Sequence, residues 1–391
     1  MRILLSTVRH PPFSYGGVGV YTDYLARAFS RMGHVAHVVT SGEALSRRIA
    51  PGHFVHYLPF PERAPFGTGI LGDALAWSMP LWQAAQEIDR RWGIDLIETP
   101  NNVPEAMHGL MAARAGKHPV VARMSTPTAL WQVNDGWKLE GERLAVCAVE
   151  EALLKCAHGL IANTHAVLED ARRCFTLPES LRPQVVHPGL PADYGILSAP
   201  SDMNDEVRVL VLSRLQPSKG ARALLAAIPA VLARDPRVRF DIVARDVPPW
   251  TFGADFRKSR PDLLDRVKFH SGITEDRKKE LLRRCHMMVA PSHYESFGMM
   301  YVEAMAFGRA TIGCPVGGVP EIVLDGRTGL LVKPDDERAL AEAILSLAAD
   351  PTRCARMGQA GYERFLERFT VERMARESLA FYQSVLERRE P

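Results

Sequence analysis

Short apolar runs alternate with helical patterns along the whole chain. In the first half, the runs are about five or six residues long and rich in Val, Ile and Leu, which is typical of buried strands. Segments with helical periodicity, such as Tyr21 to Met32 and Gly141 to Ala157, separate some of these runs. This alternation favours a parallel sheet covered by helices. The expected strands read ILLSTV, VAHVVT, LIETP, VVARM, GLIANT and QVVHPG.

The second half repeats the plan after a segment rich in Pro, Ser, Ala and Asp. This segment, Pro183 to Asp205, has few long apolar stretches, so we interpret it as a linker between two domains. The pattern therefore predicts an α/β protein with one domain over residues 1–195 and a second over residues 205–370. The expected elements of the second half are strands VRVLVLSR, RFDIVAR, VKFHSGI, HMMVAPS, ATIGCPV and 329–333, helices from Gly220, Thr274 and Gly298, and late helices near 337–349, 351–367 and 371–387.

Composition and charge exclude some classes of protein. The chain has 391 residues, enough for two or three domains of about 150 residues each. No apolar run approaches the roughly 20 residues that span a bilayer. The formal net charge of +3 is too small to indicate a nucleic acid as a partner. These features are those of an ordinary globular protein.

The opening residues and the cysteines indicate a compartment. The first residues, MRILLSTVRH, have a short apolar core cut off by Arg9 and His10, so they predict a buried strand and not a signal peptide. The 6 cysteines lie far apart and form no C-x-x-C pair. This spacing suits a reducing cytosol and argues against a disulfide framework or a zinc site. We therefore expect a cytoplasmic protein with no metal site.

The segment Phe60 to Trp92 has apolar positions that can form one face of a helix, among them Leu75, Trp77 and Leu81. An ordinary core helix is the favoured interpretation. An acceptor-binding or membrane-facing surface is the alternative, although the nearby arginines are too scattered for a convincing anionic-lipid patch.

The most informative stretch runs from Ala290 to Val323. It places two acids, Glu295 and Glu303, eight residues apart around an expected helix start near Phe297. A strand that runs into a helix start leaves free backbone N–H groups and a positive dipole end, which suit an anion. Eight helical residues rise roughly 12 Å. The two acids are therefore expected to touch different parts of one extended ligand, such as the hexose and the ribose of a nucleotide sugar.

Two further segments carry groups that suit a diphosphate. Arg214 and Lys219 follow an expected strand, where cations can neutralise a leaving phosphate; an exposed basic turn is the alternative. Gly16 and Gly17 follow the first strand, where glycine lets the backbone approach a phosphate closely; a simple tight turn is the alternative. A dinucleotide fingerprint requires G-x-G-x-x-G, but Thr22 stands at the last glycine position, which weakens an NAD-dependent oxidoreductase as a hypothesis.

Together these segments resemble the retaining, family 4 type of glycosyltransferase. Glu295 and Glu303 match its E-x7-E signature, SRLQPSKG resembles its Arg…Lys-Gly segment, and GGVPEIVLDGRTGLLVKPDD matches the run after the second acid. SYGGVGVYTDYLARAFSRMGHVAHVVT resembles its first Gly-rich loop, helix and second strand. The resemblance implies the GT-B fold, with two Rossmann-like domains facing across a cleft. It also implies that residues 371–391 form a helix that crosses back to the N-terminal domain.

The resemblance assigns roles to individual residues. Glu295 would hydrogen-bond the transferred sugar near the reacting face, Arg214 and Lys219 would hold the donor phosphates, and Glu303 would hold the ribose hydroxyls. The Gly16–Gly17 loop would close over the donor phosphates. Sugar and phosphate would also meet the helix start, made by Ser296, Phe297, Gly298, Met299 and Met300.

One segment departs from the family pattern. Where relatives carry a histidine near the primary hydroxyl of the transferred sugar, RMSTP places Ser125. This change indicates an altered donor or acceptor, or weakened transfer. The candidate acceptor or sugar contacts are Ser125, Thr126, Asn101, Asn163 and His293.

The resulting hypothesis is a metal-independent retaining transferase without a cofactor. It would take a sugar from a UDP-sugar, or from GDP-mannose as the second candidate. The acceptor would be a hydroxyl of a sugar, a lipid-linked molecule or a small molecule, in the synthesis of a cell-envelope glycan, glycolipid or small glycoside. A sugar-nucleotide-binding protein without transferase activity, or an enzyme that couples a cyclitol, is the alternative that Ser125 leaves open.

Overall fold

The computed structural model divides the chain into two compact units. Unit 1 comprises Met1–Pro191 and Val371–Pro391, and unit 2 comprises Ala192–Thr370. Part of the expected linker, residues 198–202 and 204, lies outside the described residues. None of the described helices is long and apolar enough to cross a membrane. The structure describes residues 1–8, 17–43, 45–59, 69–134, 136, 138–197, 203, 205–244, 246 and 249–388.

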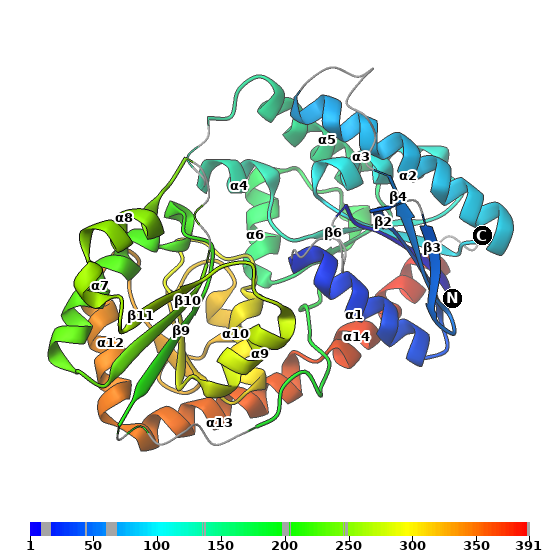
Figure 1. Ribbon diagram of the computed structural model, residues 1–391. Coiled ribbons are helices and arrows are strands. Elements are labelled where there is room, and N and C mark those ends of the chain that lie inside the picture. Colours follow the sequence, from blue (N-terminus) through cyan, green and yellow to red (C-terminus); the bar gives the residue numbers. More distant parts are fainter. Residues whose placement is uncertain are drawn as a thin grey trace. The chain divides into compact units, whose positions relative to one another are not determined.

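Unit 1 contains an eight-stranded sheet with the order β3-β4-β2-β1-β5-β6-β7-β8 (Figure 1). Every neighbouring pair is parallel except β3 and β4. The expected strands of this half are confirmed, although the last is short. The strands are β1 Arg2–Ser6, β2 Val35–Ser41, β3 Leu45–Ala50, β4 His53–Leu58, β5 Leu96–Pro100, β6 Val120–Met124, β7 Gly159–Ala162 and β8 Gln184–Val185.

Successive strand residues point to opposite faces of this sheet. Because apolar side chains lie on both faces, helices cover both. Leu4 packs with α2, α3 and α5, whereas its neighbours Ile3 and Leu5 pack with α1 and α14. Of the segment Phe60 to Trp92, residues 60–68 lie outside the described residues, and the rest from Ile70 is a core helix with Trp77 and Leu81 buried. The helices are α1 Gly17–Arg31, α2 Ile70–Trp92, α3 Val103–Ala115, α4 Thr128–Asn134, α5 Glu142–Cys156, α6 His165–Cys174 and α14 Val371–Glu387.

Sequence reasoning missed the hairpin formed by β3 and β4. The first of these strands reads LSRRIA, and its residues are exposed or half-buried. It lies at the sheet edge and, among the described strands, pairs with β4 alone. An edge strand with charged side chains has no apolar alternation to reveal it.

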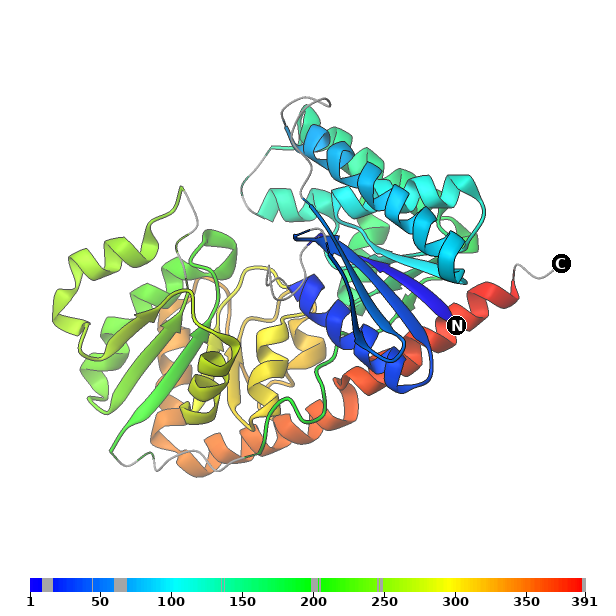
Figure 2. The same ribbon diagram turned by 45° about the vertical axis from the view of Figure 1, so that its right-hand side comes forward.

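Unit 2 contains a six-stranded sheet with the order β11-β10-β9-β12-β13-β14. All its neighbouring strands are parallel, and Figure 2 shows the sheet between layers of helices. Its three central strands β9, β12 and β13 are nearly continuous buried runs, as expected where a sheet is covered on both faces. The strands of this sheet are β9 Val207–Leu212, β10 Val238–Val243, β11 Val267–His270, β12 Met287–Ala290, β13 Ala310–Gly313 and β14 Gly329–Leu331.

The helices of unit 2 fall close to their expected places. Thr274 caps α9 by accepting a hydrogen bond from the Arg277 backbone N–H, as its position before an acidic first turn predicts. The late helices are confirmed within a residue of their expected ends. The helices are α7 Ala221–Arg234, α8 Phe252–Ser259, α9 Glu275–Arg284, α10 Met299–Ala306, α11 Val319–Ile322, α12 Glu337–Ala349 and α13 Pro351–Arg368.

The last helix, α14, is fastened to unit 1 by a buried ionic cluster. Arg123 in β6 donates to both carboxylate oxygens of Glu98 in β5, at 2.8 and 2.9 Å. Arg123 also donates to Ser378 in α14 at 2.9 Å, and the Tyr382 hydroxyl donates to Glu98 Oε2. The helix lies beside α1 (Figures 1 and 2), where Phe29 meets the Tyr382 ring edge-on at 5.9 Å. The expected return of the C-terminal helix to the N-terminal domain is confirmed.

We predict that Tyr382→Phe loosens α14. The substitution removes a hydroxyl that donates to a buried carboxylate, which costs about 1–3 kcal/mol. Hydrogen exchange of the α14 amides, followed by mass spectrometry, should accelerate at least about fivefold. Tyr362→Phe is the control, because that hydroxyl has no hydrogen bond to a described residue. Equal exchange in the wild type and Tyr382→Phe would contradict the role of the cluster.

Candidate functional site

The candidate donor site lies where unit 2 changes the direction of its strand order. From β9 the chain proceeds to β10 and β11 on one side and then returns to β12 on the other side. The carboxyl ends of β9 and β12 are therefore neighbours, with helix connections leaving on opposite faces. Ligands of open α/β sheets bind at such a point. The loop after β9 carries Arg214 and Lys219, and the loop after β12 carries Glu295.

A glycine turn brings these two loops together. Lys219 ends a short 3-10 helix, Pro217–Lys219, and Gly220 follows with φ of 68°. A Cβ atom on Gly220 would overlap the carbonyl oxygen of Pro291, which directly follows β12. Only glycine combines the left-handed backbone with this close approach. The Lys-Gly pair is thus a steric requirement for placing Lys219 beside the second loop.

Glu295 is held by a cation and a hydroxyl on the same oxygen. Lys219 Nζ lies 2.8 Å from Glu295 Oε1, and Ser292 Oγ donates to that oxygen at 2.9 Å. The Glu295 residue is only 8% exposed. Its backbone carbonyl accepts from Gly318 N–H at 2.8 Å, in the turn before α11. The two residues predicted to act together are therefore in direct contact.

The helix that carries Glu303 begins two residues later than expected. α10 runs from Met299, with Gly298 at the N-cap position, so Phe297 precedes the helix. The Phe297 side chain is 3% exposed and meets the Phe369 ring edge-on at 5.8 Å. The Phe297 side chain is thus part of the core of the protein, and a ligand contact by its backbone stays a prediction. The first N–H groups of any helix have no partner within it, which keeps Gly298, Met299 and Met300 as candidate donors; Ser296 and both methionines are half-buried.

Glu303 lies on α10 and points toward a second lysine. Lys278 Nζ lies 2.7 Å from Glu303 Oε1, and the Tyr194 hydroxyl lies 3.3 Å from the same oxygen. The side chain of Glu303 is 12% exposed. Neither Lys278 nor Tyr194 was expected to belong to the site.

The two remaining candidates in unit 2, Arg214 and His293, differ in their contacts. Arg214 is exposed, and its guanidinium has no hydrogen bond or ion pair to a described residue. His293 Nε2 lies 2.9 Å from Asp335 Oδ1, and the His293 backbone N–H donates to Ser218 O at 3.0 Å. His293 therefore ties the two loops to the segment before α12. A sugar contact by His293 stays a prediction.

In unit 1 the strand order changes direction between β1 and β5. Gly16 lies outside the described residues, and Gly17 is the first residue of α1. Val8 N–H, after β1, donates to Glu105 Oε1 in α3 at 2.7 Å. The expected phosphate contacts of Gly16 and Gly17 stay predictions.

Asn101 and Ser125, predicted separately, share one hydrogen-bond network. Asn101 Oδ1 accepts from the Ser125 backbone N–H at 3.0 Å and from Ser125 Oγ at 3.2 Å. Asn101 Nδ2 donates to Thr126 O at 2.6 Å. Asn101 is fully buried, so here it positions the Ser125–Thr126 turn. Asn163, which follows β7, is also buried, and its backbone carbonyl accepts from His187 Nδ1 at 2.8 Å.

Glu150 completes this network, and sequence reasoning missed it. Its Oε1 accepts from Asn101 Nδ2 at 2.6 Å, and its Oε2 accepts from the Thr128 backbone N–H at 2.8 Å. Glu150 is fully buried in α5. Burial raises the pKa of this carboxyl to about 7, against the opposing effect of its hydrogen bonds. An acid within a helical pattern, here next to Glu151, gives no sequence signal that it is buried in a hydrogen-bond network.

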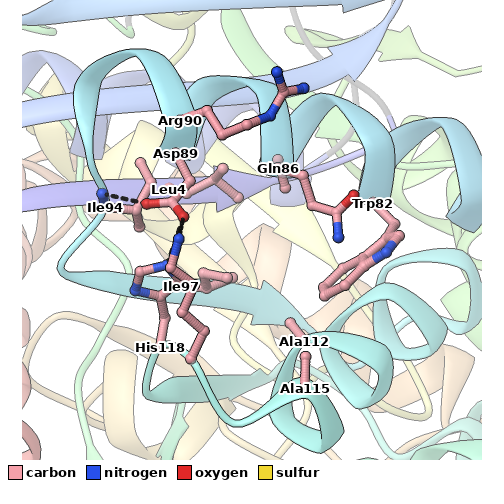
Figure 3. Close-up of a pocket in the computed structure, with 12 residues that line it drawn as sticks. Leu4, Trp82, Gln86, Asp89, Arg90, Ile94, Ile97, Ala112, Ala115 and His118 are labelled. Carbon is pink, nitrogen blue, oxygen red and sulfur yellow. Dashed lines mark hydrogen bonds and ion pairs between the residues drawn. The ribbon is translucent and has the colours of Figure 1, made fainter.

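A cavity of about 430 Å³ lies at the other end of the unit 1 sheet, near the amino ends of β5 and β6. At one side, Asp89 accepts from Lys117 and from Ile94 N–H, and His118 Nε2 lies 3.0 Å from Asp89 Oδ2 (Figure 3). The acid at that side thus has two basic neighbours within unit 1. The cavity contains none of the predicted site residues. Its lining is Leu4, Trp82, Ala85, Gln86, Asp89, Arg90, Ile94, Ile97, Ala112, Ala115, Lys117 and His118.

Comparison with known families matches both halves of the chain. Residues 15–194 match the model of "Glycosyltransferase Family 4", and residues 206–350 match "Glycosyl transferases group 1". A glycogen synthase of Mycobacterium tuberculosis is 25% identical over 98% of this chain and 94% of its own length. A D-inositol 3-phosphate glycosyltransferase of Streptomyces avermitilis is 31% identical over 71% of this chain and 57% of its own length.

Solved structures share the fold over nearly the full length. Sucrose-phosphate synthase from Thermosynechococcus elongatus superposes with a TM-score of 0.82, at 23% identity over 99% of this chain and 100% of the other. Anabaena HepE in complex with UDP and glucose gives a TM-score of 0.73, at 22% identity over 98% of this chain and 100% of the other. The GT-B architecture is therefore shared.

We predict that Glu150 makes the stability of the protein depend on pH. Its pKa is raised from 4.5 to about 7, so the folded state holds a proton that the unfolded state releases. The stabilisation is present below about pH 4.5 and is lost as the pH rises through 7. Between pH 5 and pH 8, the loss amounts to about 2–3 kcal/mol.

Thermal unfolding of Glu150→Gln and the wild type at pH 5 and pH 8 checks this prediction. The melting temperature of Glu150→Gln, relative to wild type, should rise between pH 5 and pH 8. Glu151→Gln is the control, because that neighbouring acid is partly exposed and pairs with Lys155. A pH-independent difference between Glu150→Gln and wild type would show that Glu150 ionises normally.

Proposed function

This chain belongs to the family 4 glycosyltransferases with the GT-B fold, and we propose that it moves a sugar from a nucleoside diphosphate sugar to a hydroxyl group with retention of anomeric configuration. The observation that carries the proposal is the Lys219–Glu295 pair at the switch point of unit 2. The start of α10 follows Glu295 in the chain, and this helix carries the second acid, Glu303. A cation, a helix start and two acids suit the phosphates and hydroxyls of such a donor.

The proposed reaction needs charge stabilisation at the leaving group. The bond between the anomeric carbon and the diphosphate oxygen breaks, and the acceptor oxygen bonds to that carbon on the same face. The acceptor proton passes to an oxygen of the leaving phosphate. Lys219, Arg214 and the α10 start offset the negative charge that develops there. Glu295 holds the hydroxyls of the transferred sugar.

A UDP-sugar is our first candidate donor and GDP-mannose the second. The complexes of Anabaena HepE with UDP and with UDP-glucose support the first choice by similarity of fold. For the acceptor we propose a hydroxyl of a sugar, sugar phosphate or lipid-linked glycan, in line with relatives that include a glycogen synthase and a D-inositol 3-phosphate glycosyltransferase. The absence of a cofactor, metal independence, peripheral membrane contact and a cytosolic location stay predictions. All 6 cysteines are free thiols, which suits a reducing compartment.

The hydrogen bonding of Ser125 supports a second candidate function. Its hydroxyl donates to Asn101, at the position where the family resemblance leads us to expect a histidine. A protein that binds a sugar nucleotide without transferring the sugar, or that couples a cyclitol, fits this arrangement. Nucleotide binding without turnover over a broad sugar panel, but with turnover of a cyclitol phosphate, would favour the cyclitol enzyme.

Thermal stabilisation by nucleotides tests the proposal. A ligand that binds only the native state raises the free energy of unfolding, by about 2.7 kcal/mol when its concentration is about 100 times its Kd. The melting temperature rises as a result. We expect a shift with one of UDP, GDP, ADP or dTDP and none with NAD. A shift with NAD alone would overturn the donor assignment.

We predict that Lys219→Ala lowers turnover at least about 100-fold, because a cation at the developing charge is lost. The assay is hydrolysis, with water as acceptor, of sugar donors that carry the nucleoside diphosphate identified by the panel. Lys258→Ala is the control, since Lys258 is exposed on α8. Near-normal turnover in folded Lys219→Ala protein would rule out the proposed role.

A further inference from the structure

Glu303 is held from outside its own helix by two side chains. Lys278 on α9 lies 2.7 Å from Glu303 Oε1. The hydroxyl of Tyr194, in the segment that opens unit 2, lies 3.3 Å from that oxygen. Both contacts fall on Oε1, and Oε2 has no hydrogen bond to a described residue. The carboxylate thus has one oxygen fixed and one available.

A second acid completes the support of this arrangement. Lys278 Nζ also lies 3.0 Å from Glu275 Oε2, and the Tyr194 hydroxyl lies 2.6 Å from Glu275 Oε1. Burial works against the charge on Lys278, but Glu303 and Glu275 outweigh it and raise the lysine pKa well above its usual range. Lys278 therefore stays charged at any physiological pH.

The support is rigid where it meets Glu303. Tyr194 is 5% exposed, and its ring meets the Phe307 ring edge-on at 6.2 Å. Phe307 is the C-cap residue of α10, the helix that carries Glu303. The carboxylate and its two supporting groups are thus packed as one cluster within unit 2. A carboxylate fixed in this way needs no reorganisation to accept hydroxyl groups.

We propose that Lys278 and Tyr194 are positioning residues that fix Glu303 for the vicinal hydroxyls of the donor ribose. The inference rests on the proposed function, because it takes a nucleoside diphosphate as the ligand. The preference for a ribonucleotide over its 2′-deoxy form then depends on these two residues as well as on Glu303. Neither residue needs to touch the nucleotide.

Titration calorimetry with matched nucleotides tests this inference. The probes are UDP and 2′-deoxy-UDP, together with the corresponding GDP and ADP pairs. We expect the wild type to bind one ribonucleotide about 10-fold more tightly than its 2′-deoxy form, because a hydrogen bond to a charged group is lost. Lys278→Met should reduce this ratio to about 1–3, mainly by weakening the ribonucleotide. Lys278→Arg should restore part of the ratio.

The neighbouring lysine is the matched control. Lys279 lies on the same helix and contacts the face of the Tyr194 ring at 4.4 Å. No ion pair joins Lys279 to Glu303, and both residues are described. Lys279→Met keeps an apolar chain of similar length on the Tyr194 ring, so it should keep the wild-type ratio. Tyr194→Phe removes one hydroxyl and should lower the ratio by about 2- to 3-fold, which provides a decisive variant if Lys278→Met does not fold.

The outcomes separate this inference from the proposed function. An unchanged ratio in folded Lys278→Met or Tyr194→Phe protein would overturn the positioning role. Equal weakening of both nucleotide forms would also overturn it, because that result indicates a general loss of the site. Absence of any nucleoside diphosphate binding by the wild type would instead overturn the proposed donor, and this inference with it.

Discussion

The candidate donor site depends on the close approach of two loops at the carboxyl edge of the unit 2 sheet. Charges that are mostly removed from water have to be paired. Lys219 and Glu295 satisfy each other at 2.8 Å, and they can do so only because Gly220 passes directly over Pro291. The ion pair therefore depends on the backbone turn at Gly220. Without the turn, both charged groups would lie apart in loops.

The two acids of unit 2 are held according to a common plan. Each has its Oε1 beside a lysine and a hydroxyl: Lys219 and Ser292 for Glu295, and Lys278 and Tyr194 for Glu303. In both cases the lysine comes from another element, so the orientation of the carboxylate is set by packing as well as by its own rotamer. Such support from neighbouring groups is what precise recognition of sugar hydroxyls requires.

Sequence reasoning found what local patterns encode. The buried parallel strands and the late helices were readable, because apolar runs and caps lie within a few residues. The short motifs also singled out Lys219 and Glu295, which are in contact, while the roles of Lys219, Glu295 and Glu303 stay predictions. Glu150 and Lys278 were not readable. Glu150 meets Asn101 across 49 residues, and Lys278 lies within EDRKKELLRR, which has the appearance of a solvated helix face. Only the assembled tertiary structure distinguishes these two from ordinary surface charges.

The buried cluster of Glu98, Arg123 and Tyr382 has a consequence for biosynthesis. Tyr382 joins Glu98 across 284 residues of chain, so the charged core of unit 1 stays incomplete until the ribosome has released the C-terminal helix. Unit 2 is continuous over Ala192–Thr370, so its folding does not require a later segment of the chain. During translation the later unit can therefore complete its fold first, while the earlier one lacks the cover of α14 on one face of its sheet until that helix emerges.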